Sequence, residues 1–415
     1  MNRLLNLRSG PAGEFSVVSE AHVARVAGAR LANLRRWIAA CHIDAIIIFD
    51  PVNIRYATGS RNMQIYTARN PSRYAFVPVE GPVVLFEYRG CSHLSAELPT
   101  LDGVRPARPI MPLHSGLARH HAVLEGVVAD SSEVLALSAS CTGRIGIEAA
   151  TTGAVIALLN AGYNVVDAAP AIDYAKARKV PGEIDLILSS LRCTELGVRA
   201  MEHALVPGIT ENELWAVLHE AVIAGGGDYI ETRLLNSGPR TNPWFQEASD
   251  RMIQAGELVA FDTDVVGRYG YFSDFSRTFL AGDHRPTGAQ RTLYGLAAEQ
   301  LEQNIAALAP GVTFRQYTER CWTIPDGYRE HRYMGPAHGV GMTGEYPCLP
   351  YAFDWETAGY DGDVEIEPNM TLSVESYVGH RDGGEGVKLE EQIVITETGI
   401  ERLSVYGYDE RLLGA

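Results

Sequence analysis

The chain has 415 residues, of which 46% are hydrophobic and 21% charged, so it can bury cores of the size that two or three domains need. This balance excludes an intrinsically disordered chain. The formal net charge of −16 disfavours binding to nucleic-acid phosphates and to anionic lipid headgroups, which are contacted by Lys and Arg. A small neutral or cationic molecule is the expected partner.

The N-terminal residues lack the apolar run of about 7–15 residues that a secretory signal needs. No stretch approaches the roughly 20 apolar residues of a membrane span. We therefore expect a cytoplasmic protein that does not insert into membranes.

Residues 1–170 are predicted to form a first domain of the α/β class. Helix-like segments alternate there with short apolar runs, a pattern typical of helices packed on a sheet. The predicted helices are residues 20–43 and 151–162, and the predicted strands are residues 44–49, 74–80, 81–88, 144–149 and 164–169.

Residues 171–415 are predicted to form a second domain, which begins with a long helix near Pro181 and Glu183. A proline in the first turn and an acidic residue at the positive end of the helix dipole favour a helix start there. The other predicted helices are residues 212–227, 288–311 and 313–322, and the predicted strands are residues 230–238, 257–266, 271–282, 370–379 and 387–399.

Three aspartates are predicted to converge in the first half of this second domain. Asp262 and Asp264 lie two apart in a predicted strand, so their side chains should leave the same face. The GRYG segment predicts a turn, which would bring Asp274 on the returning strand close to Asp264. Close like charges repel, so either some are protonated or cations lie between them. Divalent metal ions are the simpler explanation.

A second predicted hairpin supplies two glutamates and lies after a histidine. It turns at residues 382–384 and places Glu375 near Glu390 or Glu391. Counting by two puts Glu390 on the polar face with Lys388, so Glu390 is the better candidate. His338 precedes the hairpin in a glycine-rich segment, and an imidazole among carboxylates suits Mn, Fe, Co or Zn better than Ca or Mg.

These motifs resemble those of the pita-bread metalloenzymes, the family that includes methionine aminopeptidase, prolidase and creatinase. The shared pattern is D-x-D, an Asp ten residues on, H-G-V-G, a strand Glu and a K-L-E-E strand, within a resemblance that covers essentially the whole chain. It implies a creatinase-like N-terminal α/β domain, a C-terminal pita-bread domain and a homodimer. It also implies a centre of two divalent ions, Fe, Mn or Zn, which would bridge a hydroxide or polarise a substrate carboxylate. The implied ligands are Asp262, Asp264, Asp274, His338, Glu375 and Glu390.

Three long segments, residues 50–71, 225–248 and 261–267, resemble one branch of this family, the dimethylsulfoniopropionate lyases. These enzymes split a zwitterion into dimethyl sulfide and acrylate. In them an Asp precedes the Glu of the loop after the metal-binding His, and that Asp is taken to remove the substrate α-proton. This sequence has Gly344 at that position, which leaves Glu345, Tyr333 or a metal-bound hydroxide as the candidate base.

Two reaction classes therefore stay open at this point. One is β-elimination on a small zwitterionic or cationic substrate. The other is hydrolysis of a C–N bond in a small amide or an Xaa-Pro-like peptide. The peptidase branch carries a His-Glu pair before a Pro in this loop, whereas the loop here is one residue shorter and reads GMTGEYP.

Four side chains are the candidate substrate contacts. Aromatic faces attract sulfonium and quaternary ammonium groups, and a guanidinium can pair with a carboxylate in a bidentate way. The resemblance further implies that Tyr66 lies near the catalytic site of the partner subunit. The candidates are Tyr66, Trp244, Tyr333 and Arg240.

Overall fold

The computed structural model describes residues 17–111, 115–138, 143–360 and 363–414. They form two compact units. One consists of Ser19–Lys176 and Val180–Gly182, and the other contains Ala177–Lys179 and the chain from Glu183 onward. The predicted boundary after residue 170 lies in helix α8, Ala169–Ala177.

The N-terminal unit contains one six-stranded mixed sheet, with the strand order β4-β3-β2-β1-β5-β6. Strand β2 pairs antiparallel with both β1 and β3, whereas the pairs β3–β4, β1–β5 and β5–β6 are parallel, so β2 runs against the other five strands. The strands are β1 Ala45–Ile48, β2 Tyr74–Pro78, β3 Val84–Glu87, β4 Gly103–Pro106, β5 Arg144–Glu148 and β6 Asn164–Asp167.

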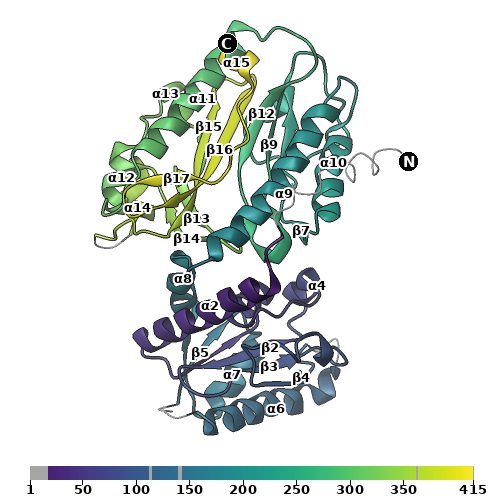
Figure 1. Cartoon of the computed structure of the whole chain (residues 1–415), viewed down its shortest axis with the longest axis vertical. Coiled ribbons are helices and arrows are strands. Elements are labelled where there is room, and N and C mark those ends of the chain that lie inside the picture. The colour runs from purple at the N-terminus through teal and green to yellow at the C-terminus, as the bar shows by residue number, and fades with distance from the viewer. Residues whose placement is uncertain (1–16, 112–114, 139–142, 361–362, 415) are drawn as a thin grey trace. The chain divides into compact units, whose positions relative to one another are not determined.

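Helices cover both faces of this sheet, with α2 on one side and α6 and α7 on the other (Figure 1). Alternate residues of β1 explain the layering, since Ala45 and Ile47 pack in one core with Val127 of α6 and Leu158 of α7. The helical segments are α2 Glu20–Ala40, α3 Pro51–Thr58, α4 Gln64–Arg69, η1 Ser92–Leu94, α6 Leu117–Ala136, α7 Thr152–Asn160 and α8 Ala169–Ala177.

The C-terminal unit contains two three-stranded sheets, β11-β10-β7 and β12-β9-β8, and one five-stranded sheet, β14-β13-β15-β16-β17. The antiparallel pairs β9–β12 and β15–β16 are the two predicted hairpins. The strands are β7 Tyr229–Ile230, β8 Leu235–Ser237, β9 Leu258–Asp262, β10 Val265–Val266, β11 Phe272–Ser273, β12 Ser276–Leu280, β13 Ala337–Val340, β14 Gly344–Leu349, β15 Thr371–Gly379, β16 Gly386–Ile395 and β17 Ile400–Arg402.

Helices lie on both sides of these strands, with α9 and α10 on one side and α11 and α12 on the other (Figure 1). One core cluster joins Tyr294 and Leu301 of α11 to Val374 of β15 and Leu389 of β16. The helical segments are α9 Glu183–Ala204, α10 Glu211–Ala224, η2 Gly238–Thr241, η3 Arg268–Gly270, α11 Gly288–Ala306, α12 Phe314–Arg320, α13 Asp326–Arg329, η4 Ala352–Asp354, α14 Trp355–Ala358 and α15 Glu410–Leu413.

Some predicted elements differ in detail from those of the structure. The long helix begins at Glu183, so Pro181 precedes it instead of lying in its first turn. Residues 230–238 do not form one strand, because residues 231–234 separate β7 from β8. Within the described part of the chain, no helix has both the length and the apolar composition that crossing a membrane would require.

Candidate metal centre

The first hairpin brings the three aspartates together, although not on one strand. Strand β9 ends at Asp262, and Asp264 follows with a φ of 41°, in the left-handed region. Asp and Asn tolerate this region better than most side chains do, and the Thr232 hydroxyl donates a hydrogen bond to the Asp264 carboxylate. The prediction that Asp262 and Asp264 share a strand is therefore wrong, but both carboxylates still lie beside Asp274.

The second hairpin has the predicted register. Glu375 on β15 lies directly opposite Glu390 on β16, so the two side chains share a face. Glu391 points to the other face, where its carboxylate lies 2.6 Å from the guanidinium of Arg277 and accepts a hydrogen bond from Ser404. Glu390 therefore lies with Asp274 and His338, whereas its role as a metal ligand stays a prediction.

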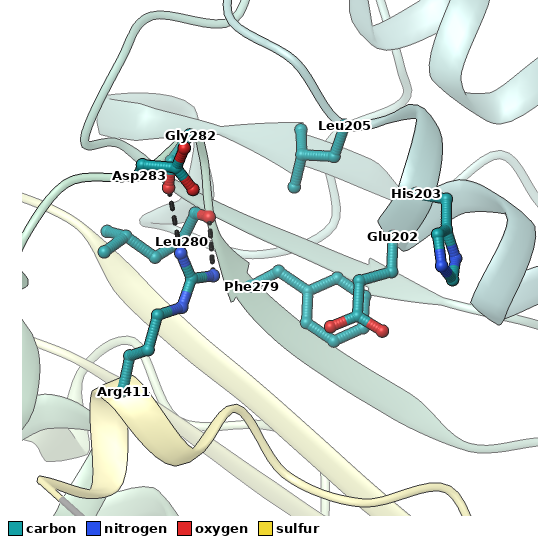
Figure 2. Close-up of a pocket in the computed structure, with 8 residues that line it drawn as sticks. All are labelled: Glu202, His203, Leu205, Phe279, Leu280, Gly282, Asp283 and Arg411. Atoms are coloured by element: carbon teal, nitrogen blue, oxygen red, sulfur yellow. Dashed lines mark hydrogen bonds between the residues drawn. The ribbon is translucent and has the colours of Figure 1, made fainter.

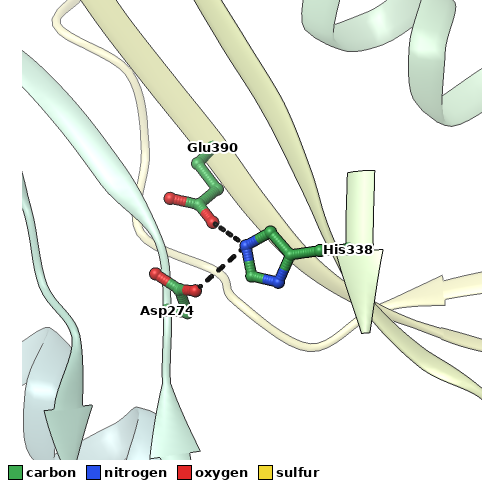
Figure 3. Close-up of side chains that lie close together, drawn as sticks. All are labelled: Asp274, His338 and Glu390. Atoms are coloured by element: carbon green, nitrogen blue, oxygen red, sulfur yellow. Dashed lines mark ion pairs between the residues drawn. The ribbon is translucent and has the colours of Figure 1, made fainter. Parts of the chain in front are cut away.

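His338 on β13 points its imidazole between the two hairpins (Figure 3). Its Nε2 lies 3.4 Å from Asp274 Oδ2, 3.4 Å from Glu375 Oε1 and 4.0 Å from Glu390 Oε1. Its Nδ1 lies 3.0 Å from the Gly339 carbonyl oxygen. A proton donated from Nδ1 to that carbonyl leaves Nε2 free to bind a metal ion.

Two groups of side chains have the spacing of a metal site, and they share one residue. Asp274, His338 and Glu390 form one group, and Asp262, Asp264 and Asp274 form the other. Each group offers ligand atoms within 4.8 Å of one another. Asp274 belongs to both groups, so it would help to hold each ion if two were bound.

Unpaired buried oxygens support the fit of metal ions. Among the described residues, no hydrogen-bond partner exists for Asp262 Oδ1, Glu375 Oε1 or Glu390 Oε1. Buried carboxylate oxygens are rarely left without a partner, because their desolvation is costly. The oxygen and imidazole donors suit Mn, Fe or Zn, as expected from the sequence.

The carboxylates repel one another in this protein-only cluster. Burial and the charge of Asp262 raise the pKa of Asp264 to about 7. Burial and the charge of Glu390 raise the pKa of Asp274 well above its usual range. Burial lowers the pKa of His338, but its contacts with Glu375 and the Gly339 carbonyl, together with the charge of Asp262, leave the pKa raised. Cations between these groups would relieve the repulsion.

Aromatic side chains lie next to the carboxylates. Trp244, Tyr333 and Tyr377 pack in one cluster, and the ring of Phe245 stacks on that of Tyr333 with centroids 5.2 Å apart. Burial and the charge of Glu375 raise the pKa of Tyr333 well above its usual range, so its hydroxyl keeps its proton at neutral pH. Among the described residues, the buried indole N–H of Trp244 has no hydrogen-bond partner.

The remaining sequence candidates have other contacts. Glu345 pairs with Lys179 at 2.9 Å and accepts a hydrogen bond from the Met342 backbone N–H at 2.8 Å. Arg240 pairs with the buried carboxylate of Glu211. Tyr66 lies on α4 in the N-terminal unit, where its ring meets the edge of another tyrosine, Tyr88. Catalytic and substrate roles for these residues stay predictions.

Lys388 also belongs to this site, although it was not among the site residues predicted from the sequence. Its ammonium lies 2.5 Å from Glu375, 3.0 Å from Glu390 and 3.4 Å from Asp262. The alternation of side chains along β16 could have identified it, because this alternation places Lys388 on the same face as Glu390.

A separate cavity of about 370 Å³ lies where the end of α9 meets β12 and α15 (Figure 2). The guanidinium of Arg411 donates to the carbonyl oxygens of Leu280 and Gly282, so its charge is already engaged. None of the candidate site residues lines this cavity, whose lining is Glu202, His203, Leu205, Phe279, Leu280, Gly282, Asp283 and Arg411.

Comparisons with known proteins agree with this architecture. Residues 185–397 match the model of metallopeptidase family M24, and residues 30–177 match the creatinase/prolidase N-terminal domain. The chain belongs to metallopeptidase family M24. It is therefore a metalloenzyme with a creatinase-like N-terminal domain and a pita-bread C-terminal domain, as the resemblance implied.

Two relatives are named dimethylsulfoniopropionate lyases. The lyase of Roseovarius nubinhibens is 37% identical, over 89% of this chain and 83% of the relative. That of Roseobacter denitrificans is 33% identical, over 95% of this chain and 91% of the relative. Among solved structures, an Xaa-Pro dipeptidase from Bacillus anthracis has a TM-score of 0.73 at 19% identity, covering 92% of this chain and 99% of that one. That likeness shows the fold alone.

Glu390 and Glu391 of this M24 enzyme offer a matched pair of variants. We expect Glu390→Gln to weaken metal binding more than tenfold, since even loss of a residue behind the ligands costs about 10–100-fold. We expect Glu391→Gln to retain metal but to lower the free energy of unfolding by about 3 kcal/mol, because Arg277 is fully buried and would lose its carboxylate partner. Elemental analysis and urea unfolding of both variants would measure this. Metal loss in Glu391→Gln alone would contradict the assignment.

Proposed function

We propose that this M24 enzyme binds two divalent metal ions and catalyses β-elimination on a small zwitterionic onium carboxylate, of which dimethylsulfoniopropionate is the first to test. The two ligand groups that share Asp274 carry the metal part of this proposal. The 37% and 33% identity to dimethylsulfoniopropionate lyases, extending over both domains, supports the reaction class.

The side chains around the cluster suit such a substrate. Trp244 and Tyr333 pack in one cluster, and the exposed ring of Phe245 stacks on Tyr333. Aromatic rings attract an onium cation. The unpaired indole N–H of Trp244 is a donor for the substrate carboxylate. Bound metal ions would polarise that carboxylate and acidify the adjacent α-carbon.

β-Elimination needs a base that removes the α-proton, and the residues considered for this role are poorly suited to it. Gly344 has no side chain, Glu345 is engaged by Lys179, and Tyr333 keeps its proton. General-base assistance is worth about 10²–10⁴-fold. We therefore propose slow elimination of dimethyl sulfide by this protein, or faster elimination from a related substrate with a more acidic α-proton.

Hydrolysis of a C–N bond is the second candidate function. It is favoured by the match to the metallopeptidase family model and by Gly344, because hydrolysis of an amide does not require a base at that position. The substrate would be a small amide or an Xaa-Pro-like peptide. The homodimer and the choice among Fe, Mn and Zn also stay proposals.

The test is to incubate the protein, loaded separately with Fe, Mn or Zn, with dimethylsulfoniopropionate and to measure dimethyl sulfide in the headspace. We expect release above that of the protein stripped with a chelator. In parallel, dipeptides with proline in second position are screened for cleavage. No dimethyl sulfide with any of the metals would overturn the lyase proposal, and dipeptide turnover would favour hydrolysis.

A further inference from the structure

Lys388 is a fully buried cation in the middle of the candidate ligands. Its Nζ lies 2.5 Å from Glu375 Oε2, 3.0 Å from Glu390 Oε2 and 3.4 Å from Asp262 Oδ2. The Ser276 hydroxyl, at 2.8 Å, is a neutral partner. The side chain of Lys388 is 0% exposed, so solvent does not screen these contacts.

The ammonium contacts only one oxygen of each carboxylate. The other oxygens, Oε1 of Glu375, Oε1 of Glu390 and Oδ1 of Asp262, are those that lack hydrogen-bond partners among the described residues. Two of them, on Glu375 and Glu390, face the imidazole of His338. Lys388 therefore orients these carboxylates so that one oxygen of each stays available for a metal ion.

The net charge of the site also supports a role for Lys388 beside the metal ions. Five ionised carboxylates and two divalent ions would leave one negative charge in a buried site, and a single ammonium cancels it. The ring of Tyr333 covers the ammonium, with Nζ 4.6 Å from the ring centroid. This contact holds the cation in place and adds a cation–π attraction.

We infer that Lys388 is a built-in counter-cation of the metal site, a positioning residue that stabilises the cluster without metal and lowers its affinity for divalent ions. This inference rests on the proposed two-metal site. When metal is absent, the ammonium is the cation in contact with Asp262, Glu375 and Glu390. When metal ions are present, the ammonium repels them while it neutralises the carboxylate oxygens that it contacts, Oε2 of Glu375, Oε2 of Glu390 and Oδ2 of Asp262.

The test compares wild type with Lys388→Met, each as metal-loaded and as chelator-stripped protein. Loss of a partner from a buried charge cluster should lower the melting temperature of the stripped variant by on the order of 10 °C. The melting temperature of the metal-loaded variant should fall much less, because the metal ions supply positive charge. The temperature shift caused by Mn or Zn should therefore be larger in the variant. The chelator concentration that removes half of the metal should rise by about tenfold or more.

Lys179→Met is the matched control. Lys179 is also a buried lysine, with 2% of its side chain exposed, and it pairs with Glu345 at 2.9 Å instead of with the candidate ligands. This variant should lower the melting temperatures of both forms by similar amounts.

Two results would overturn the inference. Equal destabilisation of the loaded and stripped Lys388→Met protein would make Lys388 a packing residue only, and easier removal of its metal by chelator would reverse the predicted sign. If the stripped variant does not fold, chelator competition on the loaded protein still shows whether Lys388→Met binds metal more tightly or more weakly than wild type. Absence of any metal-induced shift in wild type would instead remove the proposed metal site, a failure that is distinguishable from the other two.

Discussion

Replacing Gly344 with aspartate should raise the rate of dimethyl sulfide release by about 10²–10⁴-fold, the usual contribution of a positioned general base. The added carboxylate would take the α-proton, the freed electron pair would form the C=C bond of acrylate, and the C–S bond would break. The site has room for it, because a Cβ at Gly344 would meet no atom within 4 Å. The backbone is held in place by the pairing of Gly344 with Val340 on β13 and by the ion pair of Glu345 with Lys179.

The control for this prediction is Gly344→Asn, which has nearly the same shape but cannot accept the proton. Initial rates are compared at equal metal content, with dimethyl sulfide measured by headspace gas chromatography. Equal rates for the Asp and Asn variants would show that position 344 does not supply a base. A large gain in the Asp variant, over a wild type that releases no product, would mean that the native substrate is a different molecule.

Replacing Asp274 with asparagine should remove both metal ions. Asp274 belongs to both ligand groups, whereas Asp264 and His338 each belong to one. Loss of the shared carboxylate therefore deprives each ion of an anionic ligand, and loss of a ligand should cost more than the roughly 10–100-fold known for the residues behind ligands. Elemental analysis after gel filtration should show less than one ion per chain.

Asp283→Asn provides the comparison, since Asp283 lines the separate cavity near α15 and belongs to neither ligand group. It should retain the metal content of wild type. His338→Ala should lose fewer ions than Asp274→Asn. If all three variants bind metal equally, the assignment of the centre fails.

The spacing of residues along the chain was enough to predict much of the candidate centre. Alternation along a strand fixes which side chains share a face, so Glu390 could be chosen over Glu391, and the position of the turn fixed the pairing of Glu375 with Glu390. The alternating helices and short apolar runs also predicted the α/β class of the N-terminal domain. These features depend on neighbours within one hairpin or one layer.

The tertiary structure alone decided which polar groups are already paired. Glu345 was a candidate base from its place in the loop, but Lys179, 166 residues away, binds it. Arg240 was a candidate substrate contact, but Glu211 on α10 binds it. Asp264 reaches the cluster through a left-handed backbone, and Lys388 points into the cluster instead of into solvent. Strand periodicity assigns a side chain to a face, but its partners come from distant segments that only folding brings to that face.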